Sequence, residues 1–182
     1  MKNNFIIFII LSILTKNVMA ENLSIKAVNI SIDKKTQSTI FKDDVIIEDE
    51  IGNIIKSDYA EYDKENNIIH LKENIIFNDV DNNILRTEQA TYNEILKIFK
   101  TYGKTTFKSP NGYSLEGSLI SLNNKNKTIF SDNSTVVKDL DGNTINLENF
   151  EYMSSKKIFK SIGKIEVNDK KNNTYFFSQL II

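Results

Sequence analysis

Residues that could do chemistry are few in this chain. The 182-residue sequence contains no Cys and a single His, His70, in the segment IIHLK. A zinc site needs several convergent ligands, so His70 cannot form one alone, and thiol chemistry is excluded. We interpret His70 as a solvent-facing strand residue. No Gly-x-Ser-x-Gly, phosphate-binding loop or dinucleotide-binding motif occurs.

Acidic residues are numerous, but they gather in segments typical of turns. The segment KDDVIIEDE is the densest, and we interpret it as solvated loop charge. The alternative is a Ca²⁺ site without EF-hand spacing, which would use Asp43, Asp44, Glu48, Asp49 and Glu50. Paired carboxylates of a carbohydrate-cleaving repeat protein also stay open. We expect a protein that is not an enzyme, with no catalytic residue, no metal and no cofactor.

The first twenty residues have the layout of a secretory signal peptide. Lys2 precedes an apolar run from Phe5 to Leu14, and VMA follows before a cleavage point after Ala20. The run is short against the roughly 20 residues that cross a bilayer, so an uncleaved anchor is the alternative. The prediction is a signal peptide at 1–20 and one mature domain at 21–182.

The charge of the chain argues against a nucleic-acid partner. The formal net charge is −1, and removal of Lys2 and Lys16 with the signal peptide changes it to −3. Binding of the phosphate backbone needs a basic surface, which this composition does not favour. An exported chain without Cys must also be held together by burial and backbone pairing alone.

The elements that organise the chain come from a repeat of 30 residues. NIIKSDYAEYDKE, Asn53 to Glu65, returns as NILRTEQATYNEI, Asn83 to Ile95. Written in rows of 30 from Ala27, the chain keeps this spacing without insertion or deletion. Apolar residues recur at the fourth position of each row and at three others. The sixth position reads Ile32, Tyr62, Tyr92 and Leu122, the twenty-first reads Ile47, Phe77, Phe107 and Val137, and the twenty-ninth reads Ile55, Leu85, Leu115 and Ile145.

Turn residues separate short β-prone segments in every row. Asn, Asp and Gly cluster twice per row, and a tighter break falls mid-row, as at Asp43-Asp44 and Gly103-Lys104. The segments between are rich in Ile, Val, Phe, Tyr and Thr, which predicts antiparallel hairpins. A parallel β-helix with one coil per row is less compatible with so many tight turns.

The longest segments change face half-way along. Ile55 has one parity in its strand, whereas Ala60 and Tyr62 have the other. A flat strand would place them on opposite faces. We therefore predict a bulge or bend near Ser57-Asp58 and its equivalents, so that one strand serves two packed layers. The alternative is a regular strand that exposes some apolar residues.

The repeat resembles that of the organic-solvent-tolerance (OstA-like) family, which includes LptA, LptC and the N-terminal domain of LptD. Ala60-Glu61-Tyr62-Asp63 and Ala90-Thr91-Tyr92-Asn93 match the centre of its pattern. Gly103 and Gly163 stand where its Gly-Asn-Val is usual. The resemblance covers nearly the whole mature chain. It implies an all-β fold, an incomplete, elongated and twisted β-jelly roll of antiparallel hairpin repeats.

The resemblance also implies a function in the lipopolysaccharide export bridge. An apolar groove would hold the acyl chains, and the expected lining is the set of twelve residues named above for the sixth, twenty-first and twenty-ninth positions. Other jelly-roll components would stack on edge strands. A row cut short at the C-terminal end favours the N-terminal part of the outer-membrane assembly protein LptD, with an outer-membrane lipoprotein as partner. A soluble LptA-like bridge protein is the alternative, and signal cleavage disfavours the tethered member.

Three hypotheses follow for the exported chain. The first is a periplasmic lipid-conducting module at or attached to the outer membrane. The second is a carbohydrate-active or adhesive β-repeat protein outside the cell. The third is a structural spacer with a closed, dry core. From the residues alone, a closed core and an open groove are equally compatible with the apolar positions.

Overall fold

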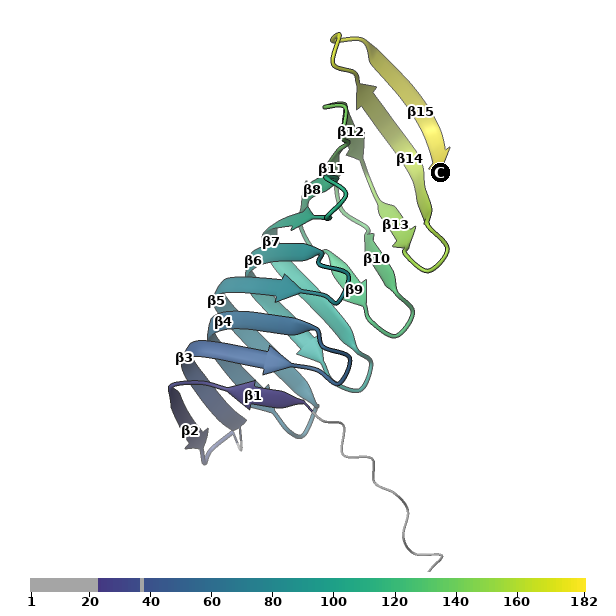
Figure 1. Cartoon of the computed structure of the whole chain (residues 1–182). Coiled ribbons are helices and arrows are strands. Elements are labelled where there is room, and N and C mark those ends of the chain that lie inside the picture. The colour runs from purple at the N-terminus through teal and green to yellow at the C-terminus, as the bar shows by residue number, and fades with distance from the viewer. Residues whose placement is uncertain (1–22, 37) are drawn as a thin grey trace, which may run out of the picture.

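The computed structural model describes residues 23–36 and 38–182, and the predicted signal peptide lies outside the described residues. The described chain consists of strands and turns, which form one elongated array (Figure 1). The strands are β1 (Ser24–Lys26), β2 (Asn29–Asp33), β3 (Ser38–Glu48), β4 (Ile54–Asp63), β5 (Ile68–Asn78), β6 (Ile84–Asn93), β7 (Ile98–Lys108), β8 (Ser114–Gly117), β9 (Ser121–Asn123), β10 (Thr128–Ser131), β11 (Thr135–Lys138), β12 (Thr144–Leu147), β13 (Phe150–Met153), β14 (Ile158–Asn168) and β15 (Thr174–Ile181).

The strands form one 15-stranded antiparallel sheet that folds over into two layers. The long strands β3 to β7, β14 and β15 run through both layers. Layer one also contains β1, β8, β11 and β12, and layer two contains β2, β9, β10 and β13. This confirms the predicted all-β jelly roll of hairpin repeats. The antiparallel pairing among the described strands excludes the parallel β-helix.

Each long strand passes from one layer to the other at a bulge. The pairing of β3 with β4 shifts between Lys42 and Val45, opposite Ser57 and Tyr59. In β4 the buried positions are Ile55, Ser57 and then Ala60. The parity change read from the sequence is therefore a real change of face, and the regular-strand alternative is wrong.

The bulges require left-handed backbone at the mid-row break. Asp43 and Glu73 have φ of 62° and 67°, and Gly103 and Gly163 occupy the same row position with φ of 78° and 121°. Glycine adopts this conformation without steric cost, whereas most other residues do so rarely. The recurring break predicted from the sequence is thus a recurring backbone geometry.

The cross-strand register reproduces the 30-residue period. In layer one, the twenty-first position pairs with the twenty-ninth, as in Ile47 with Ile55 and Val137 with Ile145. In layer two, the sixth position pairs with the thirteenth position of the preceding row, as in Tyr92 with Ile69. Directly paired residues share a face. The apolar positions therefore form continuous rows along the inner face of each layer.

A repeated carboxylate cap closes the turns at one end of the strands. Asp139 Oδ1 accepts the backbone N–H of Asp141 and Asn143, both at 2.9 Å, and Asn143 Nδ2 donates to Asp139 Oδ2 at 2.7 Å. Burial raises the pKa of Asp139, but these hydrogen bonds outweigh it and leave the pKa below the usual value. The same cap recurs at Asp49, Asp79 and Asp169. The sequence analysis found the Asn residues but missed the Asp four positions earlier.

Candidate functional site

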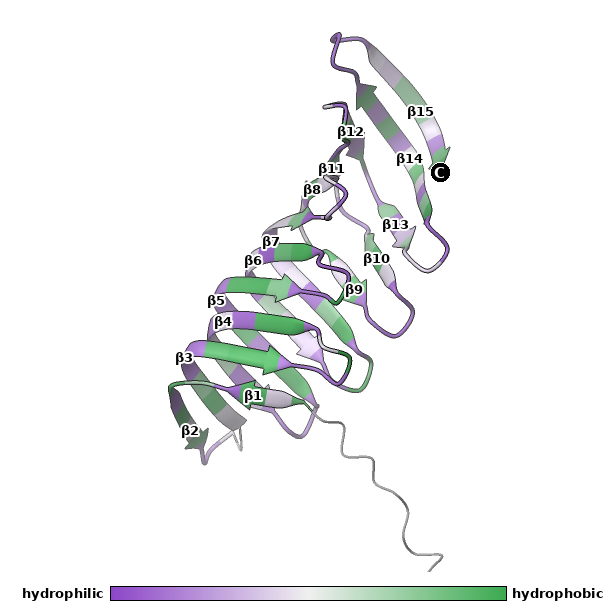
Figure 2. Cartoon of the chain, in the orientation of Figure 1, coloured by the Kyte–Doolittle hydropathy of each residue, from purple (hydrophilic) through white to green (hydrophobic). Residues whose placement is uncertain are grey.

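The space between the layers is filled in the N-terminal rows. Leu85 and Phe99 are 0% exposed, and the rings of Phe77 and Phe99 lie 4.9 Å apart between centroids. Hydropathic colouring shows apolar residues gathered on the long strands and polar ones at their turns (Figure 2). From β3 to β9 the inner faces form a closed apolar core with the packing expected of a protein interior.

The interior becomes accessible in the C-terminal rows. Val137, Ile145 and Val167 have the same row positions as buried core residues, yet they are only half-buried. On β15, Tyr175 pairs with Val167 on the inner face and is 47% exposed. Phe177 also faces inward, opposite Ile165, and is 48% exposed. Near the bulges the inner face stays covered, as at Ile165, which is 0% exposed, but farther along the last strands it is an accessible apolar surface.

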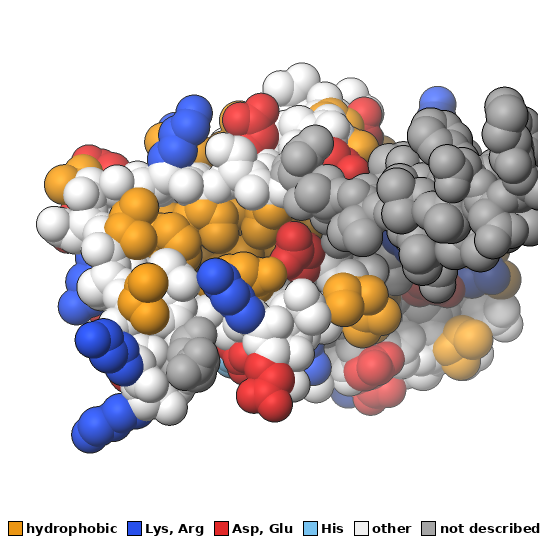
Figure 3. Space-filling view, turned by 90° about the horizontal axis from the view of Figure 1, so that it is seen from below, with side chains coloured by type: hydrophobic (Ala, Val, Ile, Leu, Met, Phe, Trp, Pro, Cys, Tyr) orange, Lys and Arg blue, Asp and Glu red, His pale blue; other side chains and the backbone are white. Residues whose placement is uncertain are grey.

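The N-terminal end also exposes inner-face residues. Ile30 pairs with buried Phe41, and Ile32 pairs with Thr39, so both lie on the inner face of β2. They are 59% and 71% exposed. A view of this end shows apolar side chains recessed between the rims of the layers (Figure 3). Both ends of the array therefore present inner-face apolar residues to solvent.

The twelve residues expected to line the groove fall into three environments. All lie on the inner faces, because they belong to the paired positions described above. Ile47, Ile55, Phe77, Leu85, Tyr92, Leu115 and Leu122 are buried, whereas Tyr62, Phe107, Val137 and Ile145 are half-buried and Ile32 is exposed. In the described structure, only the last two groups offer surface that a ligand can touch without separating the layers.

A line of inner-face positions beside the bulges does not follow the apolar pattern of the sequence. In the middle rows these are Thr87, Thr101 and Thr105, at most 5% exposed. Thr105 Oγ1 lies 2.9 Å from Thr101 Oγ1 and 3.2 Å from Thr87 Oγ1, and Thr101 Oγ1 also donates to Ile120 O at 3.2 Å. These row positions have the same 30-residue spacing, but they contain hydroxyl residues in some rows and apolar residues in others, so a search for apolar residues alone does not find them.

The two layers join along the bulges. Opposite that junction, each layer ends in a row of turns. We call the turns at 34–36, 64–67, 94–97, 124–127 and 154–157 the lysine edge, and those at 49–53, 79–83, 109–113, 139–143 and 169–173 the acidic edge. The two edges approach one another where the interior is closed. Lys97 Nζ on the lysine edge lies 3.9 Å from Glu50 Oε1 on the acidic edge, and the Lys97 side chain is 16% exposed.

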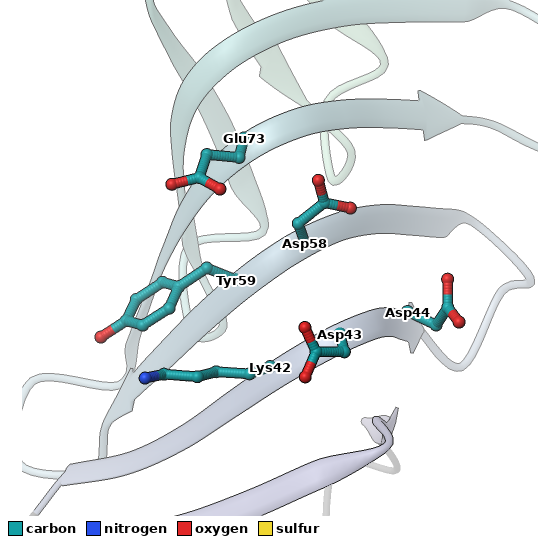
Figure 4. A pocket seen from close by; sticks show the side chains of 6 residues that line it. All are labelled: Lys42, Asp43, Asp44, Asp58, Tyr59 and Glu73. Atoms are coloured by element: carbon teal, nitrogen blue, oxygen red, sulfur yellow. The ribbon is translucent and has the colours of Figure 1, made fainter.

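A polar depression of about 460 Å³ lies on the outer side of the first bulges. It is lined by Lys42, Asp43, Asp44, Asp58, Tyr59 and Glu73 (Figure 4). Partial burial, and then Glu61, whose carboxylate accepts the Tyr59 hydroxyl at 3.3 Å, raise the pKa of Tyr59. Lys72 Nζ lies 5.4 Å from the centre of the Tyr59 ring. The depression is separated from the apolar interior by the sheet.

The Ca²⁺ alternative finds no support in the geometry. Asp49 caps its own turn, and Glu50 lies beside Lys97, so neither joins Asp43 and Asp44 in the depression. Within residues 23–36 and 38–182, no group of three or more His, Cys, Asp or Glu side chains is placed to hold a metal ion. In the same part of the chain, no helix is long and apolar enough to cross a membrane.

Comparisons with known proteins place the chain in a family. The model of the lipopolysaccharide-assembly, LptC-related family matches residues 20–133. No curated protein sequence matches the chain. Among solved structures, LptH of Pseudomonas aeruginosa, described as the LptA-homologous periplasmic component of a lipopolysaccharide transport device, is 10% identical, with 86% of this chain and 94% of that chain covered and a TM-score of 0.31.

A second solved structure is the TCP10 domain of Danio rerio CPAP. It is 11% identical, with 85% of this chain and 97% of that chain covered and a TM-score of 0.15. At these TM-scores neither likeness carries an argument about function. The family match covers well over half of the sequence. This chain therefore belongs to the LptC-related family of lipopolysaccharide-assembly proteins.

Proposed function

We propose that the chain is a periplasmic module that binds lipopolysaccharide by its acyl chains and passes it toward the outer membrane. The observation that carries the proposal is the continuous inner face of apolar positions, which is uncovered in the C-terminal rows. Membership of a lipopolysaccharide-assembly family supports this ligand. The same membership agrees with a transport protein rather than an enzyme.

The acyl chains would bind beside the half-buried residues of the C-terminal rows. Val137, Ile145 and Val167 line this stretch from layer one. Covering them gains about 25 cal/mol per Å² of apolar surface removed from water. Entry between β4 and β7 would first require separation of fully buried side chains such as Leu85 and Phe99. The uncovered rows therefore give the favourable site, and the filled rows stabilise the fold.

The ends of the array would dock other jelly-roll components. Within the described residues, β15 pairs only with β14, and β2 pairs only with β3. An unpaired edge offers backbone N–H and C=O groups for strand addition. Beside each edge lie exposed inner-face residues, Ile32 at one end and Phe177 at the other. Stacking on these edges would join the apolar inner faces into one track.

The finer assignment within the export bridge is also part of the proposal. Its finer part is that the chain is the N-terminal part of the outer-membrane assembly protein LptD, located at the outer membrane with its lipoprotein partner. A soluble LptA-like bridge protein in the periplasm is the alternative. The family model that matches is the LptC-related one, so the choice of component stays a prediction.

Site-specific photo-crosslinking in cells tests the proposed lipid path. A photoreactive residue at Val137 should capture lipopolysaccharide, because Val137 faces the uncovered interior. The matched control is Val136, the adjacent residue of the same type, which pairs with Glu116 on the outer face. Equal capture at both positions, or capture at Val136 alone, would show that the interior is not the lipid site.

A further inference from the structure

The two edges of turns carry opposite charge. The lysine edge contains Lys34, Lys35, Lys64, Lys97, Lys125, Lys127, Lys156 and Lys157 against Glu65 and Glu94. The acidic edge contains Asp49, Glu50, Asp79, Asp81, Asp139, Asp141 and Asp169 against Lys170 and Lys171. The chain as a whole is nearly neutral, so this separation is a property of the fold and creates a field across the margin of the interior.

The positive charge is least compensated in the C-terminal rows. The residue directly before each turn of the lysine edge is Asp33, then Asp63, and these carboxylates cap the turns that follow and offset part of their positive charge. Asn93 and Asn123 take over the cap in the next two turns, and Met153 holds the equivalent place in the last. The turns at 124–127 and 154–157 therefore contain lysines without any acid.

The backbone holds these lysines in a conformation that lysine seldom adopts. The final residue of successive turns is left-handed, with φ of 56° at Lys97, 55° at Lys127 and 55° at Lys157. Asn or Gly fits this position better, and Asn67 occupies it one row earlier with φ of 54°. Strained backbone of this kind is enriched at functional sites.

The two lysine turns are fixed side by side. Lys127 O accepts the backbone N–H of Ser154 at 2.9 Å and its hydroxyl at 3.0 Å. Neither turn forms an ion pair with any described residue, in contrast to Lys97, which lies beside Glu50. The nearest acids on the adjoining elements, Asp132 and Glu151, line an outer depression together with Lys160, and Asn126 of the first lysine turn lines the same depression. The lysine ammonium groups thus remain available to an external anion.

We infer that the turns at 124–127 and 154–157 bind the anionic phosphate groups of the lipid whose acyl chains enter the interior. This rests on the proposed function and adds the part of the ligand that the apolar interior cannot recognise. Inner-face Ile129 and Phe159 each lie two residues from a left-handed lysine, about 7 Å along a strand. An acylated sugar phosphate can therefore contact the apolar surface and the ammonium groups together, and charge-assisted hydrogen bonds fix its orientation.

Binding of purified lipopolysaccharide to the mature chain tests this inference. The variant carries Lys125→Gln, Lys127→Gln, Lys156→Gln and Lys157→Gln, and a second carries Arg at the same four positions. The matched control removes four lysines in or directly before the turns of the acidic edge, with Lys108→Gln, Lys138→Gln, Lys170→Gln and Lys171→Gln. Each protein is titrated with the phosphorylated lipid and with the same lipid after removal of its phosphates, and inorganic phosphate is added as a competitor.

We expect the Gln variant to bind the phosphorylated lipid at least about tenfold more weakly, because each lysine near an anionic lipid surface contributes to binding. The Arg variant and the acidic-edge control should stay within about twofold of the unaltered protein. The dephosphorylated lipid should not distinguish the variants. Rising salt should weaken only binding of the phosphorylated lipid to proteins that keep the charges.

Four outcomes would overturn the inference. Unchanged binding of phosphorylated lipid by the Gln variant removes the lysine turns from the site while leaving the lipid module intact. An equal loss for both lipids shows damage to the acyl-chain site instead. Full competition by millimolar inorganic phosphate assigns the turns to a free anion. If the unaltered protein binds neither lipid, the proposed function itself fails, and the inference fails with it.

Discussion

At the scale of single residues, the fold depends on a few side chains that sit in unfavourable backbone conformations. Asp43, Glu73, Lys127 and Lys157 all have positive φ, a conformation that costs non-glycine residues about 1–2 kcal/mol each. Asn at such positions costs less, because its short polar side chain bonds locally. Replacement of these lysines should therefore raise the stability of the protein while it weakens ligand binding.

Replacement of Lys127 by Asn should stabilise the protein. The left-handed φ of 55° suits Asn, so we expect a gain of about 0.5–1 kcal/mol. For a domain of this size, that corresponds to a rise in Tm of about 1–3 °C. The control is Lys125→Asn, which makes the same charge change in the same turn at a residue outside the left-handed region. If both variants melt at the same temperature, backbone strain at Lys127 is not the cause.

At the scale of elements, the bulge is what turns a hairpin into a jelly roll. Each long strand contributes one half to each layer, and the bulge changes its facing side between the halves. The sequence showed this as a parity change, because burial follows a period of two on either side of the break. It could not show which residue holds the left-handed backbone when Gly is absent, as at Asp43 and Glu73.

Substitutions at the bulge should follow the sign of φ. Glu73→Gly should stabilise by about 0.5–1 kcal/mol, because its φ of 67° suits Gly and the exposed side chain is dispensable. Gly103→Ala should destabilise by about 1–2 kcal/mol, from backbone strain alone, since nothing lies near its Cβ position. Equilibrium urea unfolding gives both values.

Gly163→Ala serves as the more severe case in the same series. A Cβ there would lie 2.7 Å from Glu148 Oε2, which accepts the backbone N–H of Lys164 at 3.0 Å. The cost should exceed that of Gly103→Ala, because the φ of 121° at Gly163 lies farther outside the left-handed region than the 78° at Gly103, and because the Glu148 side chain must move away from its hydrogen bond. A smaller cost at Gly163 than at Gly103 would contradict the description of the last bulge.

At the scale of the whole molecule, burial of the interior declines along the array. Successive members of one row position read Ile55, 4% exposed, Leu85, 0%, Leu115, 8%, then half-buried Ile145 and finally Tyr175, 47% exposed. Because these residues share one row position, their rising exposure reflects fewer side chains packed against them from the opposite layer toward the C-terminal end. Beside the bulges the core continues to Ile165, which is 0% exposed, so the accessible surface of the last rows lies toward the turns at the ends of the strands.

Hydrogen exchange should reveal the same gradient. Local opening is least favourable where many apolar contacts are buried, so amides of β5 and β6 should exchange more slowly than those of β13 to β15. Phosphorylated lipopolysaccharide should slow exchange in β13 and β14 and leave β5 and β6 unchanged. Mass spectrometry of peptide fragments measures both effects. Uniform exchange along the array, or protection confined to β5 and β6, would place the lipid elsewhere.

The sequence by itself determined the all-β class, the 30-residue period, the turns and the change of face. These features depend on the order of residue types along the chain, because successive residues of a strand point to opposite faces of the sheet. Only the tertiary structure decided which rows are closed and which are open. Equivalent positions of different rows look alike in the sequence, whereas their burial depends on contacts between the two layers. It also decided that lysines from five turns meet along one edge, since antiparallel pairing brings residues 30 positions apart to the same margin.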